Sequence, residues 1–135
     1  MSRKFSVRYS AIAGTQAGFG RTASGRTCIA DRPQGVAGGE GLGFNGAELL
    51  AASLGGCFWN DFHYAVDRLT ANLSINRVEA WVDVAGEPGR IVRAHIAAHL
   101  TGEGDVADLV FQSARENSTI ANSLQAAFPI VFERL

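Results

Sequence analysis

The chain reads Asn45-Gly-Ala-Glu-Leu-Leu-Ala-Ala-Ser-Leu-Gly-Gly-Cys57-Phe-Trp-Asn-Asp61 where its longest helix is expected. Asparagine is favoured at the position before a helix, so Asn45 predicts a helix start, and the helix should run to Leu69. Apolar residues recur at spacings of three and four, which predicts one buried stripe: Leu50, Leu54, Phe58, Phe62, Val66 and Leu69. Between Ala51 and Cys57 nearly every face is apolar or small, so this part is expected to be buried all round.

Two glycines, Gly55 and Gly56, lie inside this predicted helix. Each should cost about 1 kcal/mol relative to alanine in a helix interior. We therefore expect another backbone or a ligand to approach the helix closely at this point.

The residues before the helix are expected to form strands and then a loop. The N-terminal segment has the period-two alternation of a half-buried strand, with Phe5, Val7 and Tyr9 as its apolar positions. Glycines are expected to mark a turn after it: Gly14, Gly18 and Gly20. Residues 26–30 form a further predicted strand, and the glycine-rich residues 31–46 are expected to be a loop.

The residues after the helix predict a hairpin and two further helices. Strands are expected over residues 78–84 and 91–100, joined by the turn Gly86-Glu-Pro-Gly89. Asp105 is expected to cap a helix that extends to Ala114, and a second helix should cover residues 119–127. Residues 130–135 are predicted to form a short edge strand. The whole pattern predicts a single α+β domain over residues 1–135.

Composition limits the classes of function. Hydrophobic residues make up 47% of the 135 residues and charged residues 19%, which is enough apolar content for a core. The net charge is −1 and the basic residues are scattered, so neither nucleic acid nor a membrane surface is an expected partner. The N-terminus lacks a secretory signal and no segment resembles a membrane span, so we expect a cytoplasmic protein with reduced thiols.

Cys57 is the one candidate reactive residue. A cysteine is nucleophilic as the thiolate, which requires a positive charge, hydrogen-bond donors or a helix N-terminus nearby. Asp61 lies one helical turn further on, and its carboxylate would oppose loss of the thiol proton. Activation should therefore come from elsewhere, with Arg32 in the glycine-rich loop as the best candidate donor. The alternative is an unreactive core cysteine, which is the commoner fate of a free thiol.

The sequence predicts neither a metal site nor a cofactor. His95 and His99 would have Cα atoms about 13 Å apart on one strand, too far to share an ion. His63 would lie about 240° around the helix from Cys57. The glycine-rich loop lacks the ending of a phosphate-binding loop, and no hydrolase nucleophile elbow is present.

Two motifs resemble the OsmC/Ohr family of organic hydroperoxide reductases. The first runs from Asp31 to Cys57 and is similar to the family pattern Gly-x-Asn-Pro-Glu-x-Leu-Leu-x-Ala-Ala-x-x-x-Cys. The second, Ala114-Arg-Glu-Asn-Ser-Thr-Ile-Ala-Asn-Ser-Leu124, is similar to Ala-x-x-x-Cys-Pro-Val-Ser-Asn-x-Leu. The resemblance implies an OsmC-like fold, an intertwined homodimer with antiparallel sheets wrapped around two central helices.

The resemblance also implies a mechanism, from which this sequence departs. In the peroxidase members, a first cysteine attacks a hydroperoxide, an arginine and a glutamate orient it, and a second cysteine resolves the sulfenic acid. Cys57 matches the first cysteine, whereas Ser118 stands at the resolving position. Ala47 stands where the family has its glutamate, and Glu48 one place later should point elsewhere on the helix.

The arginine of the family motif has several candidates in this chain. Arg32 falls near the family position, with Arg21 and Arg26 as alternatives. Cys28 could act as a substitute resolving cysteine only if its Cα lies within about 7 Å of that of Cys57. Otherwise Cys28 is a structural cysteine.

Two functions follow from this resemblance. The first is a thiol-dependent peroxidase with Cys57 as its single reactive cysteine, an organic hydroperoxide as substrate and an external thiol as reductant. The alternative is a non-catalytic protein that binds a small apolar ligand at the dimer interface. Its pocket would be lined by Phe44, Phe58 and Phe62, with Trp59 nearby.

Overall fold

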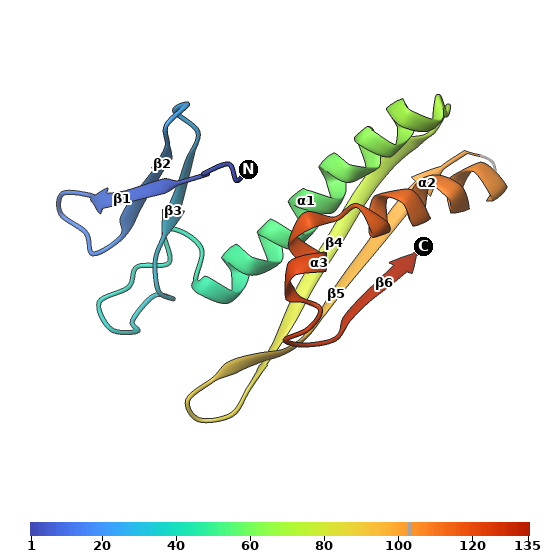
Figure 1. Ribbon diagram of the computed structural model, residues 1–135. Helices are drawn as coiled ribbons and strands as arrows, with labels where there is room; N and C mark the ends of the chain where they lie inside the picture. The colour runs from blue at the N-terminus through green and yellow to red at the C-terminus, as the bar shows by residue number, and fades with distance from the viewer. Residues whose placement is uncertain (103) are drawn as a thin grey trace. The chain divides into compact units, whose positions relative to one another are not determined.

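The computed structural model describes residues 1–102 and 104–135 of the chain. These residues form two compact units, Met1–Leu49 and Leu50–Leu135. The long helix α1 (Gly46–Leu69) begins in the first unit and continues in the second (Figure 1). The two sheets and three helices of the described residues confirm the α+β class, while a single domain over residues 1–135 stays a prediction.

The N-terminal unit contains one antiparallel sheet. Its strands are β1 (Val7–Ala11), β2 (Gly18–Thr22) and β3 (Thr27–Ala30), in the order β1-β2-β3. Every residue of β1 is exposed. The prediction of a half-buried first strand is therefore wrong for this chain, because an edge strand of a small sheet has no layer packed against its apolar side chains.

Gly18 and Gly20 lie inside β2, so the predicted turn contains Gly14 alone of the three glycines. Gly20 pairs with Tyr9 on one side and with Cys28 on the other. A Cβ at Gly20 would lie 2.8 Å from the Tyr9 ring and 2.9 Å from the Cys28 sulfur. The glycine is needed here because two larger side chains cover its position.

The predicted loop after β3 is confirmed, and the Asp31 carboxylate organises it. Asp31 is 5% exposed and accepts backbone N–H bonds from Arg32, Glu40 and Leu42. The Leu42 N–H contributes most to lowering the pKa of Asp31, and burial opposes this effect. The ionised Asp31 side chain therefore holds together, through these hydrogen bonds, a glycine-rich segment that has no regular secondary structure.

Helix α1 starts with a reciprocal cap. Asn45 Oδ1 accepts from the Glu48 backbone N–H at 2.8 Å, and Glu48 Oε1 accepts from the Asn45 N–H at 3.0 Å. This capping box satisfies two backbone donors that the helix itself leaves free. The expected helix start at Asn45 and the helix end at Leu69 are confirmed.

One face of α1 is buried as the stripe predicted, except that Leu69 in the last turn is 47% exposed and its predicted burial is wrong. Leu54, Phe58, Phe62 and Ala65 are fully buried. The expectation that residues 51–57 are buried all round is wrong, since Ala52, Ser53 and Gly56 are exposed. The two glycines also differ. A Cβ at Gly55 would lie 3.1 Å from the Ala80 Cβ, whereas a Cβ at Gly56 would have no atom within 4 Å.

The C-terminal unit contains the second sheet, which is mixed. Strands β4 (Ser74–Ala85) and β5 (Arg90–Thr101) form the predicted hairpin, and β6 (Ile130–Arg134) pairs with β5 in parallel. The order β4-β5-β6 confirms that β6 is an edge strand. A parallel neighbour requires a long connection, and α2 (Gly104–Glu116) and α3 (Thr119–Leu124) supply it (Figure 1).

Helix boundaries in this connection differ slightly from expectation. α2 begins at Gly104, so Asp105 lies in its first turn and is not the cap. α3 ends at Leu124, and residues 125–127 form a turn before Pro129.

The core of this unit lies between the helices and one face of the sheet. Phe58 of α1 packs against Phe111 of α2 and Phe132 of β6, with ring centroids 5.5 and 5.9 Å apart. Ala94, Ile96 and other alternate residues of β5 join the same cluster. The opposite sheet face is polar, with Arg93 bonded to Asp83 and Trp81 stacked on His95. Within the described residues, no helix is both long and apolar enough to cross a bilayer.

Two leucines on helices provide a matched test of this core. Leu54 on α1 is 0% exposed and Leu109 on α2 is 64% exposed. We expect Leu54→Ala to lower the free energy of unfolding by about 2–5 kcal/mol, because it removes apolar contacts and leaves a cavity. Leu109→Ala should change it by less than about 0.5 kcal/mol. Urea unfolding followed by circular dichroism measures both, and equal losses would contradict this packing.

Candidate functional site

Cys57 lies on α1 within a small polar cluster in the C-terminal unit. The half-buried thiol donates a hydrogen bond to Asp61 Oδ2, with sulfur and oxygen 3.3 Å apart. Ser118 Oγ donates to the Cys57 sulfur at 3.7 Å. Asp61 lies one turn after Cys57 on the same helix, while Ser118 comes from the start of α3. The cluster therefore places the Cys57 thiol beside a carboxyl group and a hydroxyl group.

The Ser118 side chain contacts the Cys57 sulfur and does not cap its own helix, α3. It occupies the N-cap position of α3, but its side chain makes no cap hydrogen bond. The residue is 0% exposed. Its hydroxyl gives up the usual capping role and contacts the Cys57 sulfur.

Burial raises the pKa of Asp61 above its ordinary value. The hydrogen bond from Cys57, the nearby Ser118 hydroxyl and the charge of Arg68 lower it and offset only part of the effect. The residue is 8% exposed, so little water is available to solvate a negative charge. Asp61 consequently holds a proton to a higher pH than an exposed aspartate does.

Glu48 is occupied at the start of α1. Its carboxylate accepts from the Asn45 backbone N–H in the capping box described above. This bond gives Glu48 a structural role at the helix start. A role for Glu48 at Cys57 stays a prediction.

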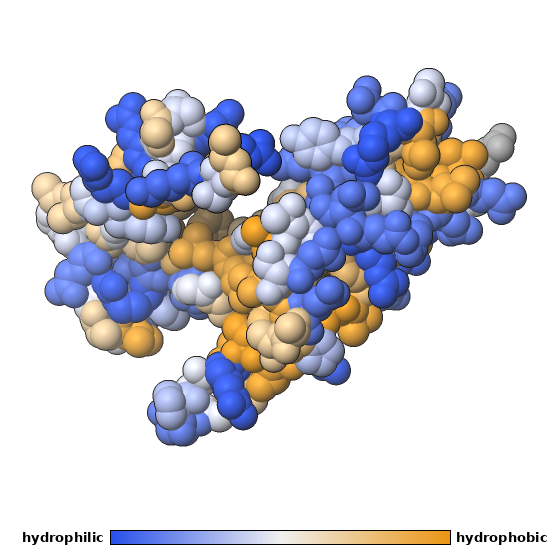
Figure 2. Space-filling view, viewed as in Figure 1, coloured by the Kyte–Doolittle hydropathy of each residue, from blue (hydrophilic) through white to orange (hydrophobic). Residues whose placement is uncertain are grey.

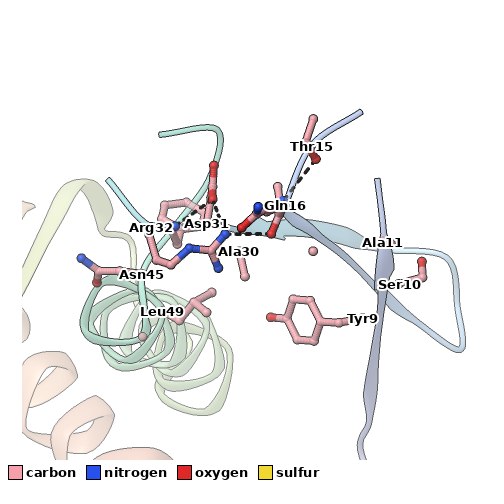
Figure 3. A pocket seen from close by; sticks show the side chains of 14 residues that line it. Tyr9, Ser10, Ala11, Thr15, Gln16, Ala30, Asp31, Arg32, Asn45 and Leu49 are labelled. Carbon is pink, nitrogen blue, oxygen red and sulfur yellow. Dashed lines mark hydrogen bonds and ion pairs between the residues drawn. The ribbon is translucent and has the colours of Figure 1, made fainter. Parts of the chain in front are cut away.

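Arg32 belongs to a second cluster, in the N-terminal unit. Its Nη2 donates to the Gln16 carbonyl oxygen at 2.8 Å and lies 3.3 Å from Asp31 Oδ1. Figure 3 shows the guanidinium between these two residues, with dashed lines marking the contacts. The buried Nε of Arg32 has no hydrogen-bond partner among the described residues. That Arg32 acts on Cys57 stays a prediction.

An open cavity of about 660 Å³ adjoins Arg32 within the N-terminal unit. Its walls are mainly apolar and include Tyr9, Ala17, Phe44 and Leu49. Figure 3 shows the Tyr9 ring and Leu49 on the side away from Asp31. Such a cavity has the size and lining of a small-molecule site.

Comparison with known proteins assigns the family. The model of the OsmC-like protein family matches residues 38–133. This chain belongs to that family. The match covers residues 38–57 of the first motif and the whole of the second, and the resemblance is thereby confirmed. No curated protein matches the sequence.

Solved structures of OsmC-like proteins share the fold. A putative osmotic stress induced and detoxification response protein from Psychrobacter arcticus 273-4 is 18% identical, with a TM-score of 0.77 over 100% of this chain and 98% of that one. The organic hydroperoxide resistance protein OsmC from Legionella pneumophila is 19% identical, with a TM-score of 0.74 over 98% of each chain. OhrB of Bacillus subtilis, an organic hydroperoxide resistance protein, is 16% identical, with a TM-score of 0.72 over 98% of each chain. At these identities the likeness establishes the fold.

The three aromatic residues expected to line a pocket belong to two different units. Phe58 and Phe62 are 0% exposed and contribute to the core of the C-terminal unit, and a pocket role for them stays a prediction. Phe44 lies in the N-terminal unit and lines the cavity beside Arg32. The two helix residues are buried because the apolar stripe of α1 faces the sheet.

The other candidate residues have local partners. Cys28 lies in β3, and its sulfur is 3.5 Å from the Tyr9 hydroxyl, a contact that raises the pKa of Tyr9. Arg26 bonds to Ser24 at the turn before β3, and Arg21 is exposed on β2. A resolving role for Cys28 stays a prediction, as does a role at the thiol for either arginine.

The histidines are engaged in separate contacts. His95 stacks on Trp81 with ring centroids 4.1 Å apart, and its Nε2 lies 3.0 Å from Glu133 Oε2. His99 bonds to Asn76. The described part of the chain contains no group of three or more side chains suited to hold a metal ion.

The contact between Ser118 and Cys57 predicts a disulfide in a designed variant. In a Cys28→Ser background, Ser118→Cys should form a bridge to Cys57 when treated with diamide, because the two side chains already touch. Thiol titration should show the loss of both free thiols, and peptide mapping should find the linked pair. Ser123→Cys, on the exposed face of α3, is the matched control and should keep its thiols. Equal bridging in both variants would contradict the described geometry.

Proposed function

We propose that this chain is a one-cysteine thiol peroxidase that reduces organic hydroperoxides through Cys57. The sulfur attacks the terminal peroxide oxygen, so the S–O bond forms as the O–O bond breaks. Cys57 is oxidised to a sulfenic acid, the hydroperoxide is reduced to an alcohol, and the thiol proton leaves with the alkoxide. A first external thiol then forms a mixed disulfide and releases water, and a second restores Cys57.

The polar cluster around Cys57 is the observation that carries this proposal. The thiol is half-buried and so reachable, and its sulfur contacts the Ser118 hydroxyl and the Asp61 carboxyl. An inert core cysteine would instead be packed among apolar side chains. Because residue 118 is a serine, it cannot form a disulfide with the Cys57 sulfenic acid, and the proposed reductant is therefore an external thiol. The proposal places the cycle in the cytoplasm, where thiol reductants are abundant, and cell fractionation tests that placement.

We propose further that the working form is a homodimer. In the N-terminal unit, Phe5 ahead of β1 is 82% exposed, and Val7 and Tyr9 of β1 are 48% and 46% exposed. On α1, Trp59 and Tyr64 are 39% and 63% exposed. Figure 2 likewise shows hydrophobic residues gathered on the displayed surface. A second copy of the chain would remove this apolar area from water.

A second candidate function is binding of a small apolar ligand without catalysis. The cavity beside Arg32 favours it, because its mainly apolar walls suit a small apolar molecule. In this reading Cys57 is not oxidised. The two functions therefore differ in the fate of the thiol.

Trapping of the sulfenic acid tests the peroxidase. Reduced protein treated with equimolar cumene hydroperoxide and then dimedone should carry the adduct on Cys57. Cys28→Ser should be labelled as wild type is, and Cys57→Ser should carry no adduct. Mass spectrometry of the peptides gives the readout. If Cys57 stays reduced and unlabelled, the proposed peroxidase function is wrong and ligand binding becomes the preferred function.

Native mass spectrometry tests the dimer and the bound ligand together. We expect the mass of two chains for wild type. Trp59→Arg should shift the population towards one chain because it places a charge on an apolar face, whereas Leu109→Arg on α2 should not. A wild-type spectrum of single chains contradicts the dimer, and additional mass on the chain that is lost on denaturation supports ligand binding.

A further inference from the structure

Asp61 is the carboxyl group that lies against the reactive sulfur. Its Oδ2 accepts the Cys57 S–H at 3.3 Å, so the thiol proton already points at an oxygen able to take it. In the family pattern, the orienting carboxylate comes from the glutamate position at the start of the helix, which is Ala47 in this chain. Asp61 lies on the other side of Cys57 in sequence, one turn towards the C-terminus of α1.

Two other carboxyl groups with a proposed or structural role, those of Glu48 and Asp31, accept hydrogen bonds from backbone N–H groups. Glu48 is held by the Asn45 N–H, and Asp31 accepts three backbone N–H bonds in the N-terminal unit. Among the described residues, Asp61 alone is a carboxyl with a hydrogen bond to the Cys57 sulfur. The groups that act on its charge are Cys57, Ser118 and Arg68.

Electrostatics constrains how the thiol can react beside this acid. Loss of the thiol proton to water would leave a thiolate next to a carboxylate in a poorly solvated site, which like charges oppose. Transfer of the proton to Asp61 keeps the pair at a single negative charge. Burial raises the pKa of Asp61, which makes it a better proton acceptor than an exposed aspartate and a group able to deliver the proton again.

We propose that Asp61 is a catalytic residue that carries the Cys57 proton to the leaving alkoxide. As the S–O bond forms and the O–O bond breaks, the S–H proton passes to Asp61 Oδ2 and then to the alkoxide oxygen, which leaves as the alcohol. Asp61 ends the step ionised, as it began. The Ser118 hydroxyl donates to the sulfur and so stabilises the negative charge that the sulfur carries once its proton has passed to Asp61. This role rests on the proposed peroxidase function.

The leaving group provides a direct test. Cumene hydroperoxide releases an alkoxide, which needs a proton, whereas peracetic acid releases acetate, which does not. The rate of sulfenic acid formation on Cys57 is measured with both oxidants in a Cys28→Ser background, by stopping the reaction with dimedone. Asp61→Asn keeps the size of the side chain and removes its capacity to accept and return a proton.

We expect Asp61→Asn to slow oxidation by cumene hydroperoxide by about 10²–10⁴-fold, the usual contribution of general acid–base catalysis. Oxidation by peracetic acid should lose far less rate, because acetate leaves without a proton and only removal of the thiol proton is affected, and the retained rate also shows that the variant is folded with an accessible thiol. Asp61→Glu should recover part of the cumene hydroperoxide rate, and it serves as the second variant if the asparagine protein does not fold.

Other outcomes overturn the role. An equal loss with both oxidants would mean that Asp61 only positions or packs Cys57. A gain with both would mean that the carboxyl only suppresses the thiolate. If wild type forms no sulfenic acid with either oxidant, both the proposed peroxidase function and the role of Asp61 are wrong. If cumene hydroperoxide oxidises wild type and Asp61→Asn equally fast, only the role of Asp61 is wrong.

Discussion

Phe58 packs between Phe111 and Phe132, and this contact fixes the rotation of α1 about its own axis. The other buried residues of the helix recur on the same side, so the whole stripe faces the sheet and the helices of the crossover. Cys57 is the residue before Phe58 and therefore lies about 100° around the helix from it. That angle places the thiol at the edge of the core, half-buried, where the start of α3 can reach it.

Two buried carboxyl groups respond to their surroundings in opposite ways. Asp31 has backbone N–H donors on both oxygens, and these bonds favour its charged form. Asp61 accepts a hydrogen bond from the Cys57 thiol and lies close to the Ser118 hydroxyl. Burial has the larger effect and raises the pKa of Asp61. Ionised Asp31 stabilises the fold above its ordinary pKa, and this is lost as the pH falls through the lowered value. Protonated Asp61 stabilises it at low pH, and this is lost as the pH rises through the raised value. Acid therefore weakens the loop, whereas the thiol site is weakened as the pH rises through the raised pKa of Asp61 and this group ionises.

Local patterns in the sequence predicted most of the elements. The stripe on α1, its cap at Asn45, the hairpin turn and the edge strand each depend on residues close together in the chain. The errors came from tertiary context: β1 lacks the covering layer that its alternation implied, and Gly20 serves the crowded pair Tyr9 and Cys28. At the site, the neighbour Asp61 followed from helix spacing. Ser118 came only from the family resemblance, because no periodicity relates positions so far apart. The partners of Arg32, like the pairing of His95 with Glu133, depend on loop and strand pairings that a single sequence does not encode locally.

The parallel pairing of β5 with β6 has a consequence for how the thiol site is assembled. The β4–β5 hairpin closes through a short turn, whereas β6 joins the sheet only after the whole crossover has been laid down. Contacts between residues distant in sequence carry a larger loop-closure entropy and tend to form late in folding. Cys57 and Ser118 are 61 positions apart, while Cys57 and Asp61 are four apart. During folding, the contact of Cys57 with Asp61 therefore forms together with α1, whereas the contact with Ser118, and with it the complete site, forms only once the crossover has folded.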